Sequence, residues 1–181
     1  ENFGDLFYDI DSDTGNETLR AVVSGKQIND GNLTYTTEPQ EAAFDYAPFG
    51  KYEVIGFMGE KYLAGYTANN SISGNRLMNT LGSGRLYRVL LDASDDRTVP
   101  EGGTLPLEEG YALRFNGVTE DRVWAALLEN GSAVEPARIF NPGDTYTYPQ
   151  ESTGRNISSG THGWSDISEL PLVSVHINSV T

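Results

Sequence analysis

Residues 111–139 consist of short apolar runs separated by Asn-Gly pairs, and this pattern limits the fold more than any other feature of the chain. In residues 111–115 the large apolar side chains fall at every second position, the period of a strand with one buried face. The Asn-Gly pairs at 116–117 and 130–131 lie between apolar runs, the last of which is 133–139. Both residue types tolerate the positive φ of a two-residue turn, so we predict a hairpin at each pair. A chain of this kind builds a β-scaffold.

Strand-like runs continue through the rest of the chain. They are short, rich in β-branched and aromatic residues, and separated by clusters of Gly, Pro, Asn, Asp and Ser. No segment keeps a helical period for three turns, so we predict an all-β, mostly antiparallel chain of about a dozen strands. The predicted strands outside this segment are residues 6–11, 18–23, 33–37, 42–46, 52–58, 62–66, 86–91, 104–107, 144–148 and 172–177, and residues 28–31 and 47–50 are predicted turns.

Two polar stretches, residues 67–84 and 150–163, are the predicted internal boundaries of the chain. They favour one or two β-sandwich domains. In the two-domain arrangement, residues 1–84 and 150–181 form a discontinuous first sandwich, and residues 85–149 form a smaller sandwich inserted into it. One larger, irregular sandwich is the alternative. The chain starts without Met and stops within a predicted strand, so we expect it to be part of a longer polypeptide.

The chain is strongly acidic, with 26 Asp and Glu against 12 Lys and Arg and a net charge of −14. Nucleic-acid binding requires clustered bases that neutralise phosphates, and the sequence has no such cluster. There is also no apolar run long enough to insert into a membrane. Two interpretations of the acidity stay open: solubility alone, or a position in salt or on a cell surface where carboxylates hold water and cations.

The sequence contains no Cys, which excludes disulfides, Cys-ligated zinc and thiol nucleophiles. It does contain several Asn-x-Ser/Thr sequons, of which those at Asn32 and Asn130 lie in predicted turns where a glycan is tolerated. We expect Asn130 to be exposed at a hairpin tip. Acidity, the absence of Cys and the sequons together favour an exported glycoprotein. The N-glycosylation candidates are Asn16, Asn32, Asn69, Asn130 and Asn156.

Two clusters of Asp residues are the candidate cation sites. The first lies at alternating positions before Gly15, which comes one position too late for an EF-hand loop. Alternation places its three carboxylates on one strand face, where they could bind Ca²⁺ if loop oxygens converge, or simply form a solvated acidic edge. The second cluster lies at the end of a predicted strand and has the same two interpretations. The residues are Asp9, Asp11 and Asp13, and Asp92, Asp95 and Asp96.

No catalytic constellation is found in the sequence. The two His residues, His162 and His176, lack a Gly-x-Ser-x-Gly elbow, and no carboxylate pair lies in an apolar setting. The Gly-Ser-Gly at 82–84 lacks the Lys of a phosphate loop. Trp124, Trp164 and the Tyr residues could line a sugar-binding face, but packing in the core is the favoured interpretation of their positions. We therefore predict a non-enzyme without a required cofactor.

Several segments taken together, in order, resemble the repeated unit of surface-layer (S-layer) proteins from methanogenic archaea. The segments are LFYDIDSDTGNETL, INDGNLTYTT, FGKYEVIGFMGEKYLAGY, RVLLDASDDRTV, LPLEEGYALRFNGV and VWAALLENGSAVEP, and PLVSVHINSV resembles the part that follows. The similarity extends from about residue 7 to residue 180. In that family the unit is usually longer and continues into a further β-rich part.

The resemblance implies an exported, N-glycosylated protein at the cell surface, built from β-sandwich domains and without catalytic residues. It implies that copies of the chain assemble into a porous two-dimensional lattice that acts as a protective, charge-selective barrier. A secreted carbohydrate- or cation-binding β-sandwich module is the alternative function.

Overall fold

The structure is a computed structural model that describes residues 2–4, 15, 17–148 and 170–180. Its elements are antiparallel strands and two short 3-10 turns, η1 (Ala47–Phe49) and η2 (Leu81–Ser83). The prediction of an all-β, mostly antiparallel chain is confirmed. In the described residues no helix is long and apolar enough to cross a membrane.

The chain divides into two compact units. The first comprises Glu1–Asp92 and Gly154–Leu170, and the second comprises Ala93–Thr153 and Pro171–Thr181. Each unit has its own apolar core among the described residues. Whether the units are independent β-sandwich domains with the boundaries expected from the sequence stays a prediction.

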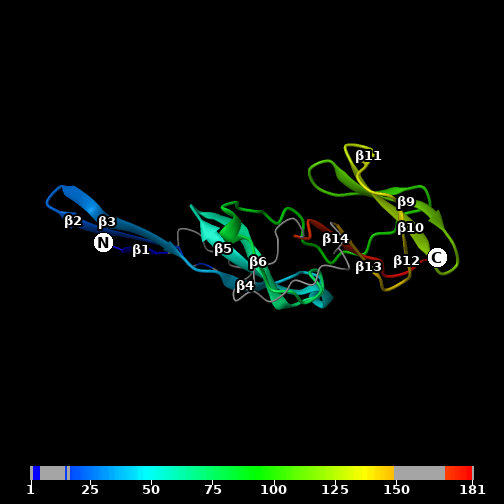
Figure 1. The fold of residues 1–181 in the computed structure, drawn as a ribbon, viewed down its shortest axis with the longest axis horizontal. Coiled ribbons are helices and arrows are strands. Elements are labelled where there is room, and N and C mark those ends of the chain that lie inside the picture. Colours follow the sequence, from blue (N-terminus) through cyan, green and yellow to red (C-terminus); the bar gives the residue numbers. More distant parts are fainter. Residues whose placement is uncertain (1, 5–14, 16, 149–169, 181) are drawn as a thin grey trace. The chain divides into compact units, whose positions relative to one another are not determined.

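The first unit begins with a three-stranded sheet of order β1-β2-β3, formed by β1 (Asn2–Gly4), β2 (Glu17–Ser24) and β3 (Gln27–Thr37). Beyond Arg20, strand β2 pairs with β3 alone, so the far end of this sheet is a two-stranded ribbon (Figure 1). The turn lies at residues 25–26, because Ser24 pairs with Gln27.

The predicted turn at 28–31 is therefore wrong. Ala21 pairs with Leu33 and Val23 pairs with Ile28, so residues 29–32 stand opposite the single residue Val22. The Asn-Asp-Gly sequence forms a wide β-bulge inside β3 instead of reversing the chain. Turn and bulge need similar backbone angles, and only the pairing with β2 distinguishes them.

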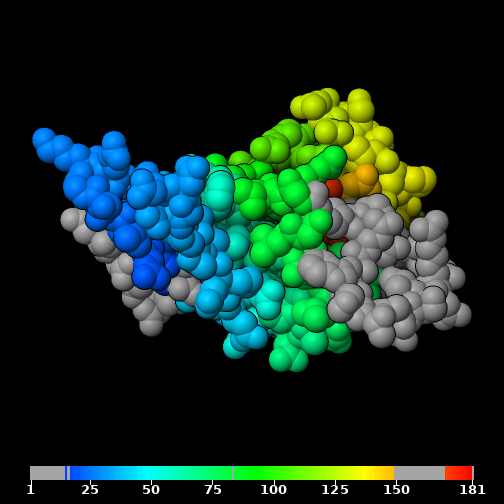
Figure 2. Space-filling model, turned by 60° about the vertical axis from the view of Figure 1, so that its left-hand side comes forward, coloured from blue at the N-terminus to red at the C-terminus, as the bar shows by residue number. Residues whose placement is uncertain are grey.

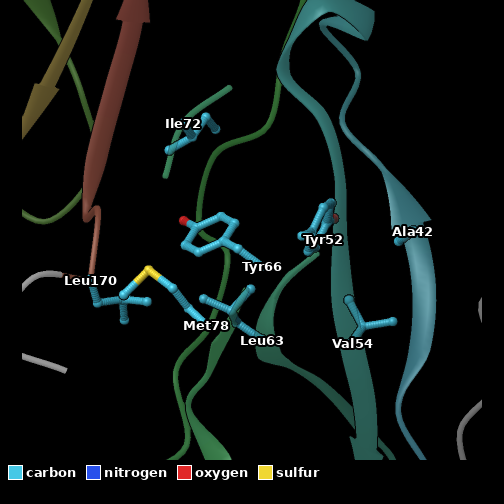
Figure 3. Packing of buried hydrophobic residues seen from close by; sticks show 8 residues of the cluster. All are labelled: Ala42, Tyr52, Val54, Leu63, Tyr66, Ile72, Met78 and Leu170. Carbon is cyan, nitrogen blue, oxygen red and sulfur yellow. The ribbon is translucent and has the colours of Figure 1, made fainter. Parts of the chain in front are cut away.

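The second sheet of the first unit has the order β4-β5-β6-β7. Its strands are β4 (Gln40–Ala43), β5 (Gly50–Phe57), β6 (Glu60–Asn70) and β7 (Met78–Asn79). A register shift between Glu53 and Val54 puts Leu63 and Tyr66 of β6 on one face, where they meet Met78 and Leu170 (Figure 3). Phe44 stacks on Tyr52 with ring centroids 4.4 Å apart and extends this core. The buried cluster consists of Ala42, Tyr52, Val54, Leu63, Tyr66, Ile72, Met78 and Leu170.

Residues 67–84 do not form the polar link that the sequence predicts. Asn70, Ser73 and Thr80 are buried. The Asn70 side chain donates to Ser73 Oγ at 2.8 Å, and the Ser73 backbone N–H donates to Asn70 Oδ1 at 2.7 Å. The Thr80 hydroxyl donates to the Leu63 carbonyl at 2.7 Å. The polar composition here belongs to an internal hydrogen-bonded network, which composition alone cannot distinguish from a solvated loop.

Residues 86–91 also differ from the prediction, because they form no strand. The Leu63 backbone N–H donates to the Tyr87 carbonyl at 2.7 Å, and this bridge is the segment's one ladder contact among the described residues. Apolar side chains of this extended segment, including Leu90 and Leu91, are exposed.

The second unit contains a bent sheet and a separate two-stranded pair. The sheet has the order β11-β10-β9-β8, and β12 also pairs with β10. Its strands are β8 (Thr104–Pro106), β9 (Tyr111–Val118), β10 (Val123–Glu129), β11 (Ser132–Ala133) and β12 (Arg138–Phe140), and the pair is β13 (Thr145–Tyr148) with β14 (Val173–His176). In place of the single strand predicted at 133–139, the structure has two short strands, β11 and β12. Pro136 lies between them and has no backbone N–H to donate to a neighbouring strand.

The core of the second unit follows the alternation seen in the sequence. Val123, Ala125 and Leu127 are buried at every second position of β10, and Leu113 of β9 faces them. Tyr146 contributes the largest fully buried side chain. The cluster consists of Leu113, Val123, Ala125, Leu127, Phe140, Tyr146 and Ile177. Since β14 pairs with β13, the last strand lies in this unit, whereas the sequence-based division grouped it with residues 1–84.

The two Asn-Gly pairs have different roles. Asn130 (φ 50°) and Gly131 (φ 82°) form the predicted turn, with Glu129 paired to Ser132. Asn116 lies inside β9 as a bulge, because Trp124 pairs with Gly117 while Ala125 pairs with Phe115. The hairpin predicted there is wrong, and the chain reverses at residues 119–122, where the Thr119 N–H donates to the Arg122 carbonyl at 2.8 Å.

The Leu127→Ala substitution tests the assigned core face. Leu127 is fully buried, so its truncation should lower the stability of the second unit by about 2–5 kcal/mol. Leu128→Ala is the matched control, because Leu128 is the next residue, points to the opposite face and is half-buried. Native hydrogen exchange of β9 and β10 measures both effects. Equal losses for the two variants would contradict the register.

Candidate functional site

Most acidic groups of the described residues are exposed, and Glu53, Asp92, Glu135 and Asp144 are half-buried. Glu17 is the one buried carboxylate in this part of the chain. Exposed ion pairs such as Lys51–Glu41 (2.9 Å) and Arg88–Glu60 (3.6 Å) neutralise a few of the others. With 26 acids and 12 bases in the sequence, most carboxylates have no base to pair with, so the exterior is negatively charged.

The Asp residues of the second predicted cation cluster do not gather into a ligand set. Asp92 is half-buried and accepts a hydrogen bond from the Asp45 N–H at 3.1 Å, and burial raises its pKa. Asp96 instead contacts the side chain of Asn178 at 3.5 Å, and Asp95 is exposed. Within the described ranges no three His, Cys, Asp or Glu residues come together to hold a metal ion. Asp9, Asp11 and Asp13 lie outside these ranges.

Two of the sequons are accessible. Asn130 is exposed at the β10–β11 turn, as the sequence predicts, and Asn69 is exposed near the end of β6. Asn32 is half-buried in the β3 bulge and not in a turn. Asn16 and Asn156 lie outside the described residues.

The aromatic and imidazole candidates occupy structural positions. His176 of β14 lies opposite Thr145 of β13, with Nδ1 and the hydroxyl oxygen 3.2 Å apart. Trp124 of β10 is half-buried and lies against the bulge, where a Cβ on Gly117 would be 3.6 Å from its ring. His162 and Trp164 lie outside the described residues.

One shallow pocket of about 340 Å³ opens beside the β5–β6 hairpin. The Tyr62, Glu60 and Arg88 side chains that line it are already paired with each other. The Tyr62 hydroxyl donates to Glu60 at 2.8 Å, which raises the pKa of Tyr62, and the Arg88 guanidinium pairs with the same carboxylate. The mutual pairing leaves Glu60 and Arg88 less available to a ligand.

A buried carboxylate connects the two sheets of the first unit, and sequence reasoning missed it. Glu17 is 0% exposed and accepts hydrogen bonds from the Tyr35 hydroxyl and, at 3.1 Å, from the Gly59 backbone N–H. Gly56 leaves the space for it, because a Cβ there would lie 3.0 Å from Glu17 Cγ. Burial and the bond to Glu17 raise the pKa of Tyr35. The signal in the sequence is an acid at an inward position of β2, in the same alternation as Leu19 and Ala21.

A second internal polar cluster lies in the second unit. The Arg138 guanidinium pairs with Glu135 at 2.8 Å, donates to the Thr147 carbonyl at 2.6 Å and lies 4.2 Å from the Tyr146 ring centroid. The Tyr146 hydroxyl donates to Glu135. Burial, together with this bond to a carboxylate, raises the pKa of Tyr146 to about 12. The cluster fixes the core in one arrangement and has the character of a structural network.

The fold and the surface together define a class: an all-β structural protein with an acidic, sequon-bearing exterior. The chain matches the S-layer protein family over residues 1–180 and belongs to this family. That membership places it at the cell surface, as a structural component of the archaeal cell envelope.

The curated relatives are Major S-layer proteins of methanogens. The protein of Methanosarcina barkeri is 30% identical over 141 residues, covering 74% of this chain and 19% of the relative. That of Methanosarcina acetivorans is 27% identical over 186 residues, covering 99% of this chain and 25% of the relative. That of Methanosarcina mazei is 28% identical over 142 residues, covering 74% and 19%. The chain thus spans a quarter or less of the length of these relatives.

Tyr146 provides a pH test of the second core. The folded state stabilises the neutral phenol of Tyr146. Its contribution to the free energy of unfolding is therefore fully present below the pKa of the unfolded chain, about 10, and is lost as the pH rises through the pKa of the folded chain, about 12. The Tyr146→Phe variant removes the ionisable group and should lose less stability over this window, even if it starts lower. Urea unfolding of both proteins between pH 9 and pH 12 measures the slopes. Identical slopes would contradict the assignment.

Proposed function

We propose that copies of this chain assemble into a porous surface lattice that acts as a protective, charge-selective barrier, and that the chain is not an enzyme. The observation that carries the proposal is the family match over nearly the whole chain. Two properties of the described residues support it: a β-scaffold with internal polar networks that are structural, and an exterior on which most carboxylates are exposed.

The barrier property follows from the charge. Openings between acidic subunits are negatively lined, and clefts of one sign concentrate counter-ions and repel solutes of the same charge. The proposed layer therefore admits small cations and excludes polyanions. The same charge makes copies of the chain repel one another until salt screens it.

The experiment that tests the proposed function is imaging of the envelope of cells that produce this chain, carrying a small tag. Electron microscopy of isolated envelopes should show the tag at every repeat of a two-dimensional array. A tagged chain that is absent from the array, or that is released as a soluble protein, would contradict the proposal.

Salt should increase self-association of the purified chain. At about 0.1 M salt the Debye length is about 10 Å, so added NaCl weakens repulsion between acidic surfaces, and CaCl₂ does so at lower concentration. Sedimentation velocity over a range of both salts measures the association state. An association state that decreases with salt would show that the contacts depend on pairing of opposite charges.

The sequons differ in accessibility, which gives a prediction about modification. We propose that Asn69 and Asn130 carry glycans, because both are exposed, and that half-buried Asn32 is modified less. Mass spectrometry of peptides from the native protein measures the occupancy at each position. Occupancy that is highest at Asn32 would contradict the placement of that residue in the β3 bulge.

A further inference from the structure

The β2–β3 ribbon exposes apolar side chains on one of its two faces. Val23, Ile28 and Leu33 are 48%, 49% and 56% exposed. Val23 lies directly opposite Ile28, and Leu33 lies directly opposite Ala21. Cross-strand partners share a face, and residues 21 and 23 share one because side chains alternate along β2. The three exposed residues, Val23, Ile28 and Leu33, are here named the ribbon face, and Ala21 beside them is buried.

The opposite side of the ribbon is polar. It carries Thr18, Arg20 and Ser24 from β2, with Thr34 and Thr36 as cross-strand partners from β3. Val22 is its one large apolar residue, at 46% exposed. The ribbon therefore has the one-sided pattern of a half-buried sheet, although the apolar side is open to solvent. In Figure 2 the residues of this ribbon, in blue, lie at the molecular surface.

The ribbon is also poor in negative charge. Residues 18–37 contain two bases, Arg20 and Lys26, and one acid, Asp30, whereas the whole chain has 12 bases and 26 acids. Contacts through the acidic parts of the surface bring like charges together, which costs free energy at low salt. A contact between two ribbons avoids this repulsion.

The ribbon is better suited to packing through its apolar face than to adding a strand at its β3 edge. Strand β3 is the edge of the β1-β2-β3 sheet, and an open edge can add a strand from another chain. Here the bulge at residues 29–32 interrupts the edge, which is a device that prevents edge-to-edge pairing. The apolar face, in contrast, takes exposed side chains from both strands.

We propose that the ribbon face packs against the same face of a second copy of this chain. Such a pairing places apolar side chains against apolar side chains, with nearly neutral surroundings, and the same patch serves both partners around a two-fold axis. The inference rests on the proposed function, since it names the surface through which lattice subunits meet. Three exposed side chains per copy bury less than the roughly 800 Å² that each partner buries in a stable dimer. A single contact is therefore weak, and the assembly is stabilised because the contact is repeated throughout the lattice.

Two neighbouring valines allow a matched test. Val23→Thr places a hydroxyl on the ribbon face, and Val22→Thr makes the same change on the opposite face at nearly equal exposure. Thr keeps the preference for strand, so both variants should fold. Sedimentation equilibrium in high salt should show self-association weakened several-fold by V23T and unchanged by V22T.

A second measurement captures the weak contact directly. The chain has no Cys, so Ile28→Cys and Val22→Cys each give a protein with a single thiol. In layers reassembled with either variant, a short bis-maleimide should join I28C chains into dimers several-fold faster than V22C chains. Circular dichroism of each variant controls for folding.

The outcomes separate this inference from the proposed function. Weaker association of V23T together with faster cross-linking of I28C supports the ribbon contact. Equal behaviour of the matched pairs, in layers that do contain the chain, overturns the ribbon contact and leaves the proposed function intact. Absence of the chain from the layer overturns both.

Discussion

The register shifts in the antiparallel pairings are the constraint on which the rest of the structure depends. The β2–β3 and β9–β10 pairings each contain one, and the β5–β6 pairing contains two. A strand has a period of two, so an extra residue on one side changes which side chains face the core beyond it. The bulge at Asn116 lets Leu113 and Ala125 share one buried face, and the bulge in β3 keeps Ile28 and Leu33 on the face of Ala21.

The elements that depend only on local pattern could be predicted from the sequence. The alternation in residues 111–115 and 123–127 gives the core of the second unit, and Asn130-Gly131 gives its hairpin. The sequence wrongly predicts chain reversals at Asn116-Gly117 and at residues 28–31, where the structure has bulges. Local sequence could not distinguish the two, because the same backbone preferences produce a bulge when a partner strand continues alongside. Burial of the polar residues in 67–84 likewise depends on partners such as the Leu63 carbonyl, which lie elsewhere in the chain.

Polar groups are distributed in a way that fits a subunit of an assembled layer. Inside, Glu17 and Arg138 are held by several hydrogen bonds each, which fixes the sheets in one arrangement. Outside, unpaired carboxylates keep the chain soluble and give the surface its negative field. The ribbon has little of this charge and carries exposed apolar residues, which fits the contact proposed for it.

Hydrogen exchange of the free chain and of the assembled layer tests this separation most directly. Amides that become covered on assembly exchange more slowly, while those that stay exposed do not change. The account predicts new protection at residues 21–33 of the ribbon, and little change at the Asn130 turn, which we expect to remain in solvent. Protection at the Asn130 turn and none at the ribbon would contradict it.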